Sequence, residues 1–262
     1  MTEHTHPLTF WKMEALGNDF VVLDGRTQKV NLSPANIQKI SDRHYGIGCD
    51  QILIIENSKI ANAKIIIFNA DGSRAEMCGN GMRAVGLYLK ASLPKILETD
   101  AGIINVQLSS DFVKASMGPC RKVQAVKIFE ETGFHVNMGN PHTVFFKDSI
   151  DKINIAEIGP KIESHLEFPN KTNVEFVEIL SPYQLKVRIW ERGVGETLAC
   201  GSGACAVVLA YWHHFGIKSA PTEVIMPGGS LKISLQDGQI YQEGPARFVF
   251  QGSLTPEFFN DE

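Results

Sequence analysis

Short runs of hydrophobic residues recur along the chain, and most of them have the length and composition of β-strands. Val, Ile, Phe and Leu dominate these runs, and polar or glycine-containing segments separate them. We expect strands at 10–13, 20–23, 51–55, 64–68, 174–179 and 185–190. Ser33 followed by Pro34 predicts a helix running toward His44, because serine is a good N-cap and proline suits the first helical position.

Two longer apolar runs predict buried helices, and each begins at a glycine-rich turn that contains a cysteine. AEMCGNGMRAVGLYL occupies 75–89, and LACGSGACAVVLAY occupies 198–211. The helix after Cys200 has almost no polar face, which is typical of a helix enclosed by other elements. A cysteine that only filled the core would be expected further along the apolar run, so these two thiols at the turn suggest a function.

The two cysteine motifs belong to an internal repeat, because Cys78 and Cys200 lie 122 residues apart and their neighbours match at the same offset. The aligned pairs include Gly79 with Gly201, Gly81 with Gly203, Asn18 with Asn140, Gln51 with Asn173, and Asn69 with Glu191. A coincidental motif would match once and lose register, whereas this register holds from Leu16 to Leu87. The sequence therefore predicts a duplicated domain.

The repeat predicts an α+β fold of two pseudo-symmetric lobes, each a curved, mostly antiparallel sheet wrapped around one central apolar helix. We place the first lobe at 1–118, with Cys78, and the second at 119–246, with Cys200. Strands at 101–108 and 228–235 are expected after the two helices. The closing segment 247–254 has no evident counterpart after Gly118, and we expect 247–262 to join the first lobe.

Composition narrows the classes of function. A net charge of −4 does not indicate a surface that binds nucleic acid or an anionic membrane, and no apolar run is long enough to span a bilayer. The first residues lack the features of a secretory signal. Five cysteines without a C-x-x-C pair fit neither a disulfide framework nor a zinc ribbon. We expect a cytoplasmic protein with no membrane partner, nucleic-acid partner or metal.

The duplicated thiols suggest a reaction. Duplication relates the lobes by a pseudo-twofold axis, so Cys78 and Cys200 would face each other if both helix N-termini lined the cleft between lobes. A carbon between two thiols can lose a proton to one and receive a proton from the other, which is racemisation or epimerisation. A helix N-terminus lowers the pKa of a cysteine and binds a carboxylate, and adjacent glycines let the backbone approach it. This chemistry needs no cofactor.

Structural explanations compete with these functional ones. Cys49, Cys120 and Cys205 are best explained as packing residues. The asparagines after Gly17 and Gly139 also fit turn chemistry, although their recurrence in both repeats favours function. His142 fits a structural histidine as well as a functional one. The adjacent charges of Glu191 and Arg192 fit a surface pair, but their position directly after a β-rich run favours a strand end at the cleft.

The sequence resembles the diaminopimelate epimerases. NADGSRAEMCGNGMR, at 69–83, resembles the first cysteine signature of that family, and WERGVGETLACGSGACA, at 190–206, resembles the second. The intervening blocks GNDFVVLD, DRHYGIGCDQIL, MGNPHTVFF and TNVEFVEI are similar as well. The chain departs from the family at Glu14 and Ala15, where His-Gly is usual, and it is short around 148–168.

The resemblance implies an isomerase that inverts one α-carbon of LL-2,6-diaminopimelate to give the meso isomer, without pyridoxal phosphate or another cofactor. That reaction serves lysine and peptidoglycan synthesis in the cytoplasm, and members of the family are usually homodimers. The catalytic thiols would be Cys78 and Cys200, with His142 and Glu191 supporting proton transfer. At the reacting end of the substrate, the carboxylate would be bound by Gly79, Asn80, Gly201 and Ser202, and the ammonium by Asn18 and Glu191. The far end would be bound by Asn69, Asn140, Asn173 and Arg192, with Gln51 lining the pocket.

Four other interpretations remain. A proline racemase would use the same thiols but needs no polar groups for a second amino-acid end, which Arg192 and the extra asparagines provide. A phenazine-pathway isomerase would share the fold without the cysteine pair. A metal-binding or hydrolytic protein using both cysteines and His142 lacks the usual close ligand spacing. A redox protein that cycles a Cys78–Cys200 disulfide is the fourth.

Overall fold

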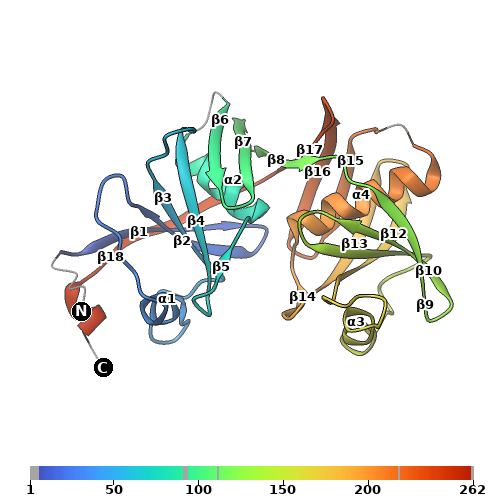
Figure 1. Cartoon of the computed structure of the whole chain (residues 1–262), viewed down its shortest axis with the longest axis horizontal. Helices are drawn as coiled ribbons and strands as arrows, with labels where there is room; N and C mark the ends of the chain where they lie inside the picture. The colour runs from blue at the N-terminus through green and yellow to red at the C-terminus, as the bar shows by residue number, and fades with distance from the viewer. Residues whose placement is uncertain (1–5, 91–93, 111, 218, 261–262) are drawn as a thin grey trace. The chain divides into compact units, whose positions relative to one another are not determined.

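The computed structural model describes residues 6–90, 94–110, 112–217 and 219–260. The chain divides into two compact units (Figure 1). Unit 1 comprises Met1–Ala115 and Pro245–Glu262, and unit 2 comprises Ser116–Gly244. Each unit contains one cysteine-capped helix, α2 in unit 1 and α4 in unit 2.

Unit 1 is built on a mostly antiparallel sheet. Its strands are β1 (Leu8–Ala15), β2 (Asn18–Asp24), β3 (Gln51–Glu56), β4 (Ala63–Asn69), β5 (Arg74–Ala75), β6 (Lys95–Thr99), β7 (Gly102–Ser109), the first part of β8 (Phe112–Pro119) and β18 (Arg247–Leu254). Strand β18 pairs with β1, and the pairing continues through β2, β3, β4, β6 and β7 to β8. The pairs β2–β3 and β4–β6 are parallel.

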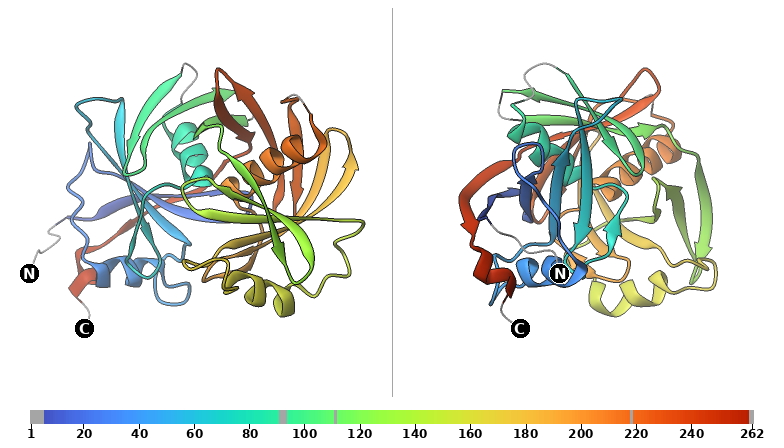
Figure 2. Two further views of the ribbon diagram at one scale, coloured as in Figure 1. Left: turned by 45° about the vertical axis from the view of Figure 1, so that its right-hand side comes forward. Right: turned by 60° about the vertical axis from the view of Figure 1, so that its left-hand side comes forward.

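The central helix of unit 1 is α2 (Gly79–Tyr88), which fills the curve of this sheet (Figure 2). Its Met82 and Val85 are fully buried in one cluster with Phe20 and Leu53 from the sheet. The helices α1 (Pro34–Ser41) and α5 (Pro256–Asn260) complete the unit. A largely apolar helix, which also carries the buried polar side chains of Asn80 and Arg83, is therefore enclosed by strands.

Unit 2 repeats this arrangement. Its strands are β9 (Val123–Ile128), β10 (Glu131–Asn137), β11 (Pro141–Lys147), β12 (Asn173–Ser181), β13 (Gln184–Glu191), β14 (Gly195–Thr197), β15 (Thr222–Met226), β16 (Gly229–Gln236) and β17 (Gln239–Gly244). The pairs β11–β12 and β13–β15 are parallel, at the places that β2–β3 and β4–β6 occupy in unit 1. Helix α4 (Gly201–Phe215) is buried from Ala204 to Trp212, and α3 (Ile155–Glu163) packs outside against β13.

The predicted fold class is confirmed: two repeated units, each a mostly antiparallel sheet around one apolar helix. One detail of the prediction was wrong. The segment that contains β18 does have a counterpart after Gly118, because β9 pairs with β10 as β18 pairs with β1. Gly118 matches Gly244 once the insertion in the second repeat is allowed for, and β9 follows Gly118 as β18 follows Gly244.

Several element boundaries also differ from the predicted ones. Helix α1 ends at Ser41 rather than near His44, because Asp42 is extended and its Oδ1 accepts hydrogen bonds from the backbone N–H groups of His44 and Tyr45. The strands expected after the two central helices begin at Gly102 and Gly229, and each follows a further strand, β6 or β15, that was not predicted. Within the described residues, no helix has the length and hydrophobicity to cross a membrane.

Candidate active site

Cys78 is the N-cap residue of helix α2. Its backbone is extended, with φ −139° and ψ 112°, and its sulfur accepts a hydrogen bond from the N–H of Gly81 at 3.3 Å. The first intrahelical bond runs from Met82 N–H to the carbonyl of Cys78, so the N–H groups of Gly79 and Asn80 lie in the turn before the helical bonds begin. The thiol thus lies at the positive end of a helix, beside backbone donors suited to an anion.

Two asparagines lie next to the Cys78 sulfur. Asn18 Oδ1 is 3.7 Å from Sγ and 3.4 Å from Asn80 Nδ2. The amide of Asn18 is held from its other side by Asp50, whose Oδ2 accepts from Nδ2 at 2.8 Å. Asn80 is buried, and its Oδ1 has no hydrogen-bond partner within the described part of the chain. Unit 1 therefore brings together Asn18, Cys78, Gly79 and Asn80.

Gln51 and Asn69 form a second polar pair of unit 1. They are register partners on β3 and β4, and Gln51 Nε2 donates to Asn69 Oδ1 at 2.9 Å. Asn69 Nδ2 in turn donates to Ser73 Oγ at 3.0 Å. Gln51 Oε1 is buried and has no hydrogen-bond partner among the described residues. A buried acceptor of this kind is suited to a ligand donor.

Cys200 is the N-cap of α4 in unit 2, with nearly the same backbone conformation as Cys78 (φ −130°, ψ 117°). Its sulfur accepts from the N–H of Gly203 at 3.4 Å and lies 3.4 Å from Ser202 Oγ. Gly201 permits a close approach, because a Cβ at that position would meet Gln242 Oε1 at 2.5 Å. Gly201, Ser202 and Cys200 are thus one turn, as the repeat predicts.

The charge state of Cys200 differs from the prediction. The sequence analysis expected the helix N-terminus to lower the pKa of each thiol. Burial instead raises the pKa of Cys200 well above its usual value, and the negative charges of Glu191 and Glu175 raise it further. The hydrogen bonds from Ser202 and Gly203 act in the opposite direction but do not outweigh burial. Burial and these charges therefore favour the thiol form of Cys200 over the thiolate.

Behind the Cys200 turn lies a chain of polar groups that ends at Asn140. His142 Nε2 is 3.0 Å from Asn140 Oδ1, and His142 Nδ1 is 2.6 Å from Glu175 Oε1. His142 and Glu175 are fully buried. Glu175 was missed by the sequence analysis, since at the repeat offset its counterpart is Leu53. An acidic residue inside a β-rich run, where the other repeat has leucine, is the signal that would have found it.

The remaining predicted residues lie at the ends of β12 and β13. Asn173 Oδ1 accepts from the backbone N–H of Arg192 at 2.9 Å, and Asn173 Nδ2 donates to the carbonyl of Pro141 at 2.8 Å. The guanidinium of exposed Arg192 donates to the carbonyl of Asn170 at 2.9 Å. Glu191 accepts from Thr197 Oγ1 at 2.6 Å. These residues lie at one edge of unit 2, to which β11 also brings His142 as the register partner of Asn173.

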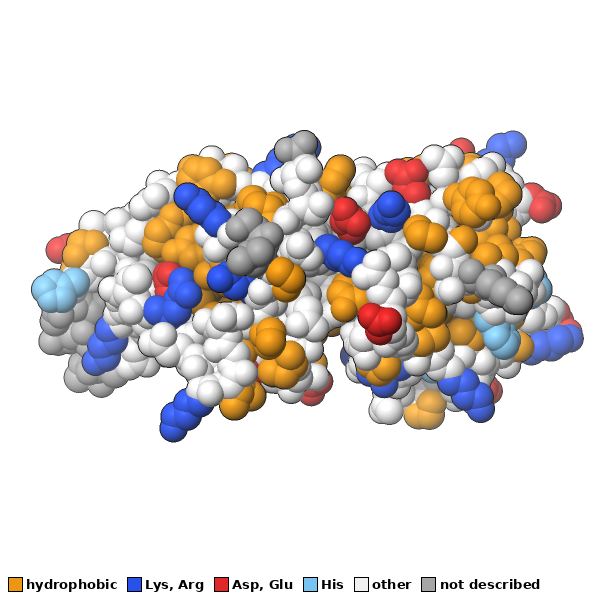
Figure 3. Space-filling view, turned by 90° about the horizontal axis from the view of Figure 1, so that it is seen from above, with side chains coloured by type: hydrophobic (Ala, Val, Ile, Leu, Met, Phe, Trp, Pro, Cys, Tyr) orange, Lys and Arg blue, Asp and Glu red, His pale blue; other side chains and the backbone are white. Residues whose placement is uncertain are grey.

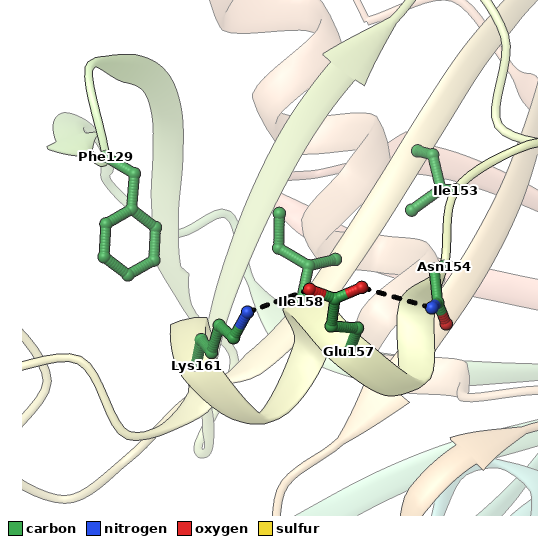
Figure 4. A pocket seen from close by; sticks show the side chains of 6 residues that line it. All are labelled: Phe129, Ile153, Asn154, Glu157, Ile158 and Lys161. Atoms are coloured by element: carbon green, nitrogen blue, oxygen red, sulfur yellow. Dashed lines mark hydrogen bonds and ion pairs between the residues drawn. The ribbon is translucent and has the colours of Figure 1, made fainter.

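A hollow elsewhere in unit 2 contains none of the predicted residues. It has a volume of about 540 Å³ and lies between α3 and the turn after β9, where Phe129, Ile153 and Ile158 line it (Figure 4). On the face drawn in Figure 3, charged side chains of both signs lie scattered among apolar ones. The described residues contain no group of three or more His, Cys, Asp or Glu that could hold a metal ion.

Solved structures with the same architecture include an epimerase and a phenazine biosynthesis protein. A hydroxyproline epimerase from Agrobacterium vitis matches with a TM-score of 0.73 and 15% identity, over 95% of this chain and 91% of that one. A phenazine biosynthesis protein of the PhzF family from Bacillus anthracis matches with a TM-score of 0.71 and 16% identity, over 95% and 99%. At such identities the likeness shows the fold alone.

Sequence comparison identifies the family. The profile of the diaminopimelate epimerase family matches residues 10–123 and 134–249, once in each repeat. Diaminopimelate epimerases from Carboxydothermus hydrogenoformans and Methanococcus maripaludis are 44% and 40% identical, each over 94% of this chain and 98% or 99% of the relative. The chain belongs to the diaminopimelate epimerase family, as the two cysteine motifs predict.

Proposed function

We propose that this chain interconverts LL- and meso-2,6-diaminopimelate by proton transfer at one α-carbon. The observation that carries the proposal is the duplicated N-cap: Cys78 and Cys200 each cap a buried helix with a sulfur that accepts the N–H three residues on. In one direction, one cysteine as thiolate removes the α-proton and becomes a thiol. The other, as thiol, gives a proton to the opposite face of the carbanion and becomes a thiolate.

The two helix N-termini bind the reacting end of the substrate. The N–H groups of Gly79, Asn80, Gly201 and Ser202 donate to the α-carboxylate and stabilise the charge that spreads onto it when the proton leaves. Asn18 and Glu191 offer oxygens to the α-ammonium. His142 and Glu191 support proton transfer at this end.

Cys200 enters the reaction as the proton donor. It is buried and its pKa is raised, so at neutral pH its thiol is ready to protonate the carbanion. Cys78 is then the base for the same direction, and the roles exchange in the reverse direction. After one turnover Cys78 is a thiol and Cys200 is a thiolate. A proton must return to Cys200 before the same direction can run again, or the next turnover must run in the reverse direction.

The far amino-acid end is bound by polar groups that a smaller substrate would not need. Arg192 supplies a planar fork for the distal carboxylate. Asn69, Asn140 and Asn173 supply amides, and Gln51 presents its buried Oε1. This set is the reason to prefer diaminopimelate over proline or hydroxyproline as substrate.

The proposed reaction supplies the meso isomer for lysine and peptidoglycan synthesis in the cytoplasm, and we propose that the chain works as a homodimer without a cofactor. Static light scattering tests the assembly, since a dimer has twice the 28.9 kDa of the chain.

The reaction is tested by incubating the purified protein with LL-diaminopimelate in deuterated water. Deuterium at the α-carbon together with meso product is the expected result. Parallel incubations with L-proline and trans-4-hydroxy-L-proline distinguish the racemase alternative, which predicts exchange with those substrates instead. Absence of exchange with diaminopimelate in enzyme that is folded and fully reduced contradicts the proposal.

A further inference from the structure

Beneath the first turn of α4 lies a buried pair of ionisable side chains, His142 on β11 and Glu175 on β12. Both side chains have no solvent exposure, and Nδ1 and Oε1 are 2.6 Å apart. A Cβ on Gly203 would come within 3.0 Å of the same Oε1. The pair therefore packs directly against the turn that carries Cys200.

The equivalent place in unit 1 is filled by hydrocarbon. At the repeat offset, His142 corresponds to Phe20 and Glu175 to Leu53, and both of these are fully buried. Leu53 packs under Gly81, where a Cβ would meet its methyl groups at 3.3 Å, as Glu175 packs under Gly203. Unit 1 thus forms the same fold with no polar side chain at these two positions. Because a buried carboxyl group costs free energy even when it is paired, the pair in unit 2 needs a reason other than packing.

The second nitrogen of His142 supplies that reason. Nε2 lies 3.0 Å from Oδ1 of Asn140, and an amide oxygen can only accept, so with the amide in this orientation the contact requires a proton on Nε2. One further proton lies between Nδ1 and Glu175 Oε1. It belongs either to an imidazolium beside a carboxylate or to a carboxylic acid beside a neutral imidazole. In both arrangements Nε2–H points at Asn140.

The surroundings of Glu175 keep that proton within the pair. Burial raises the pKa of Glu175, against the opposing effect of His142. Its Oε2 is also buried and has no hydrogen-bond partner among the described residues, so full ionisation would leave charge uncompensated there. A proton at Nδ1 or Oε1 is therefore a stable feature of this site.

We propose that Glu175 is a positioning residue: it fixes the Nε2–H tautomer of His142, and that N–H orients the Asn140 amide toward substrate. This inference rests on the proposed function for the part played by Asn140 in binding. It also makes the two halves of the site unequal, because only the Cys200 half contains such a pair.

Three variants separate positioning from packing. In Glu175→Gln the amide N–H can donate to Nδ1 as a carboxylic acid does, so the tautomer and most of the affinity for diaminopimelate should be retained. Glu175→Leu removes the partner of Nδ1 and should raise KM about tenfold, the equivalent of one lost hydrogen bond. The double variant His142→Phe/Glu175→Leu installs the pair that unit 1 already packs, so it should fold stably and show the same rise in KM. Glu178→Leu, on the same strand, is the control and should leave KM unchanged.

A second measurement needs no turnover. Long-range ¹H–¹⁵N NMR of the histidine rings, with His142 assigned by its loss in the double variant, reports which ring nitrogen is protonated. The wild type and Glu175→Gln should show a protonated Nε2, and Glu175→Leu should show a mixture of tautomers.

The outcomes are decisive in both directions. The inference is wrong if Glu175→Leu keeps a wholly protonated Nε2, if the folded double variant binds diaminopimelate normally, or if Glu175→Gln loses as much affinity as Glu175→Leu. Should Glu175→Leu fail to fold, the other two variants still decide. Should the wild type not act on diaminopimelate at all, the proposed function fails and the NMR comparison alone decides the role of Glu175.

Discussion

Asp50 holds Asn18 by a 2.8 Å hydrogen bond from Nδ2 to Oδ2, and this contact turns Oδ1 of Asn18 toward the sulfur of Cys78. Asp50 itself is fixed by Arg43, whose Nη2 lies 2.8 Å from its Oδ1. Asp50→Ala should therefore leave Asn18 free to rotate and lower kcat/KM for diaminopimelate about tenfold or more, because misplaced groups lose catalytic geometry. Steady-state kinetics measure the loss.

The stability of the Asp50→Ala variant should change little, since exposed ion pairs contribute at most about 1 kcal/mol. Asp100→Ala is the matched control: Asp100 also pairs with an arginine, Arg74, at 2.6 Å, but Asn18 Nδ2 is held by Asp50 and not by Asp100. Equal kinetic losses in both variants would show that Asp50 acts through general stability and not through Asn18.

The raised pKa of Cys200 gives a second prediction. The negative charge of Glu191 raises that pKa, so Glu191→Gln should lower it. Because only the thiolate reacts with iodoacetamide, alkylation of Cys200 should begin at a lower pH in this variant than in the wild type. Mass spectrometry of the Cys200 peptide across a pH series gives the midpoint. Glu196→Gln is the control, since Glu196 pairs with Arg188; equal midpoints in the wild type and Glu191→Gln would contradict the electrostatic explanation.

The positions of the two cysteines could be predicted from sequence because local chemistry dictates them. A cysteine followed by glycine, a polar residue and a second glycine, ahead of an apolar run, is a helix start in both repeats, and both are N-caps in the structure. The polar residues at strand ends were found the same way, since Gln51 and Asn173 hold equivalent register positions.

What could not be predicted depends on packing between distant segments. Nothing in the short run around Glu175 says that this carboxyl is buried against His142, because the sheet register that brings β11 beside β12 is a tertiary property. The charge state of Cys200 was missed for the same reason, since burial depends on the whole unit. Helix α3 was missed because Gly159 and Pro160 interrupt its pattern, yet the lack of a side chain on Gly159 lets Trp190 pack there.

A third prediction concerns the choice of substrate. Arg192→Lys keeps the positive charge but loses the planar fork that matches a carboxylate, so KM for diaminopimelate should rise about tenfold while kcat changes less. Its backbone bond to Asn173 does not involve the side chain and should persist. Arg247→Lys, at an exposed position of β18, is the control. An unchanged KM would refute Arg192 as the group that binds the distal carboxylate.

The fourth prediction tests the two-thiol mechanism itself. Replacing one cysteine by alanine removes the acid or base on one face and leaves the other face intact. Epimerisation should then collapse, by roughly 10²–10⁴-fold for the loss of one positioned group. Serine should do little better, because its hydroxyl is far less acidic than a thiol.

The single variants should nevertheless differ in a way that no structural defect would mimic. The remaining sulfur in Cys78→Ala or Cys200→Ala can still take the α-proton from the one stereoisomer that presents it on that side. Each variant should therefore exchange deuterium with, or eliminate fluoride from β-fluoro analogues of, one configuration only, and the two variants should prefer opposite configurations. In Cys78→Ala the remaining base is Cys200, whose pKa is raised by burial. Its residual exchange should therefore increase as the pH rises and more of the Cys200 thiolate forms. If both variants preferred the same configuration, the two cysteines would not act on opposite faces of the substrate, and the duplicated N-caps would need another explanation.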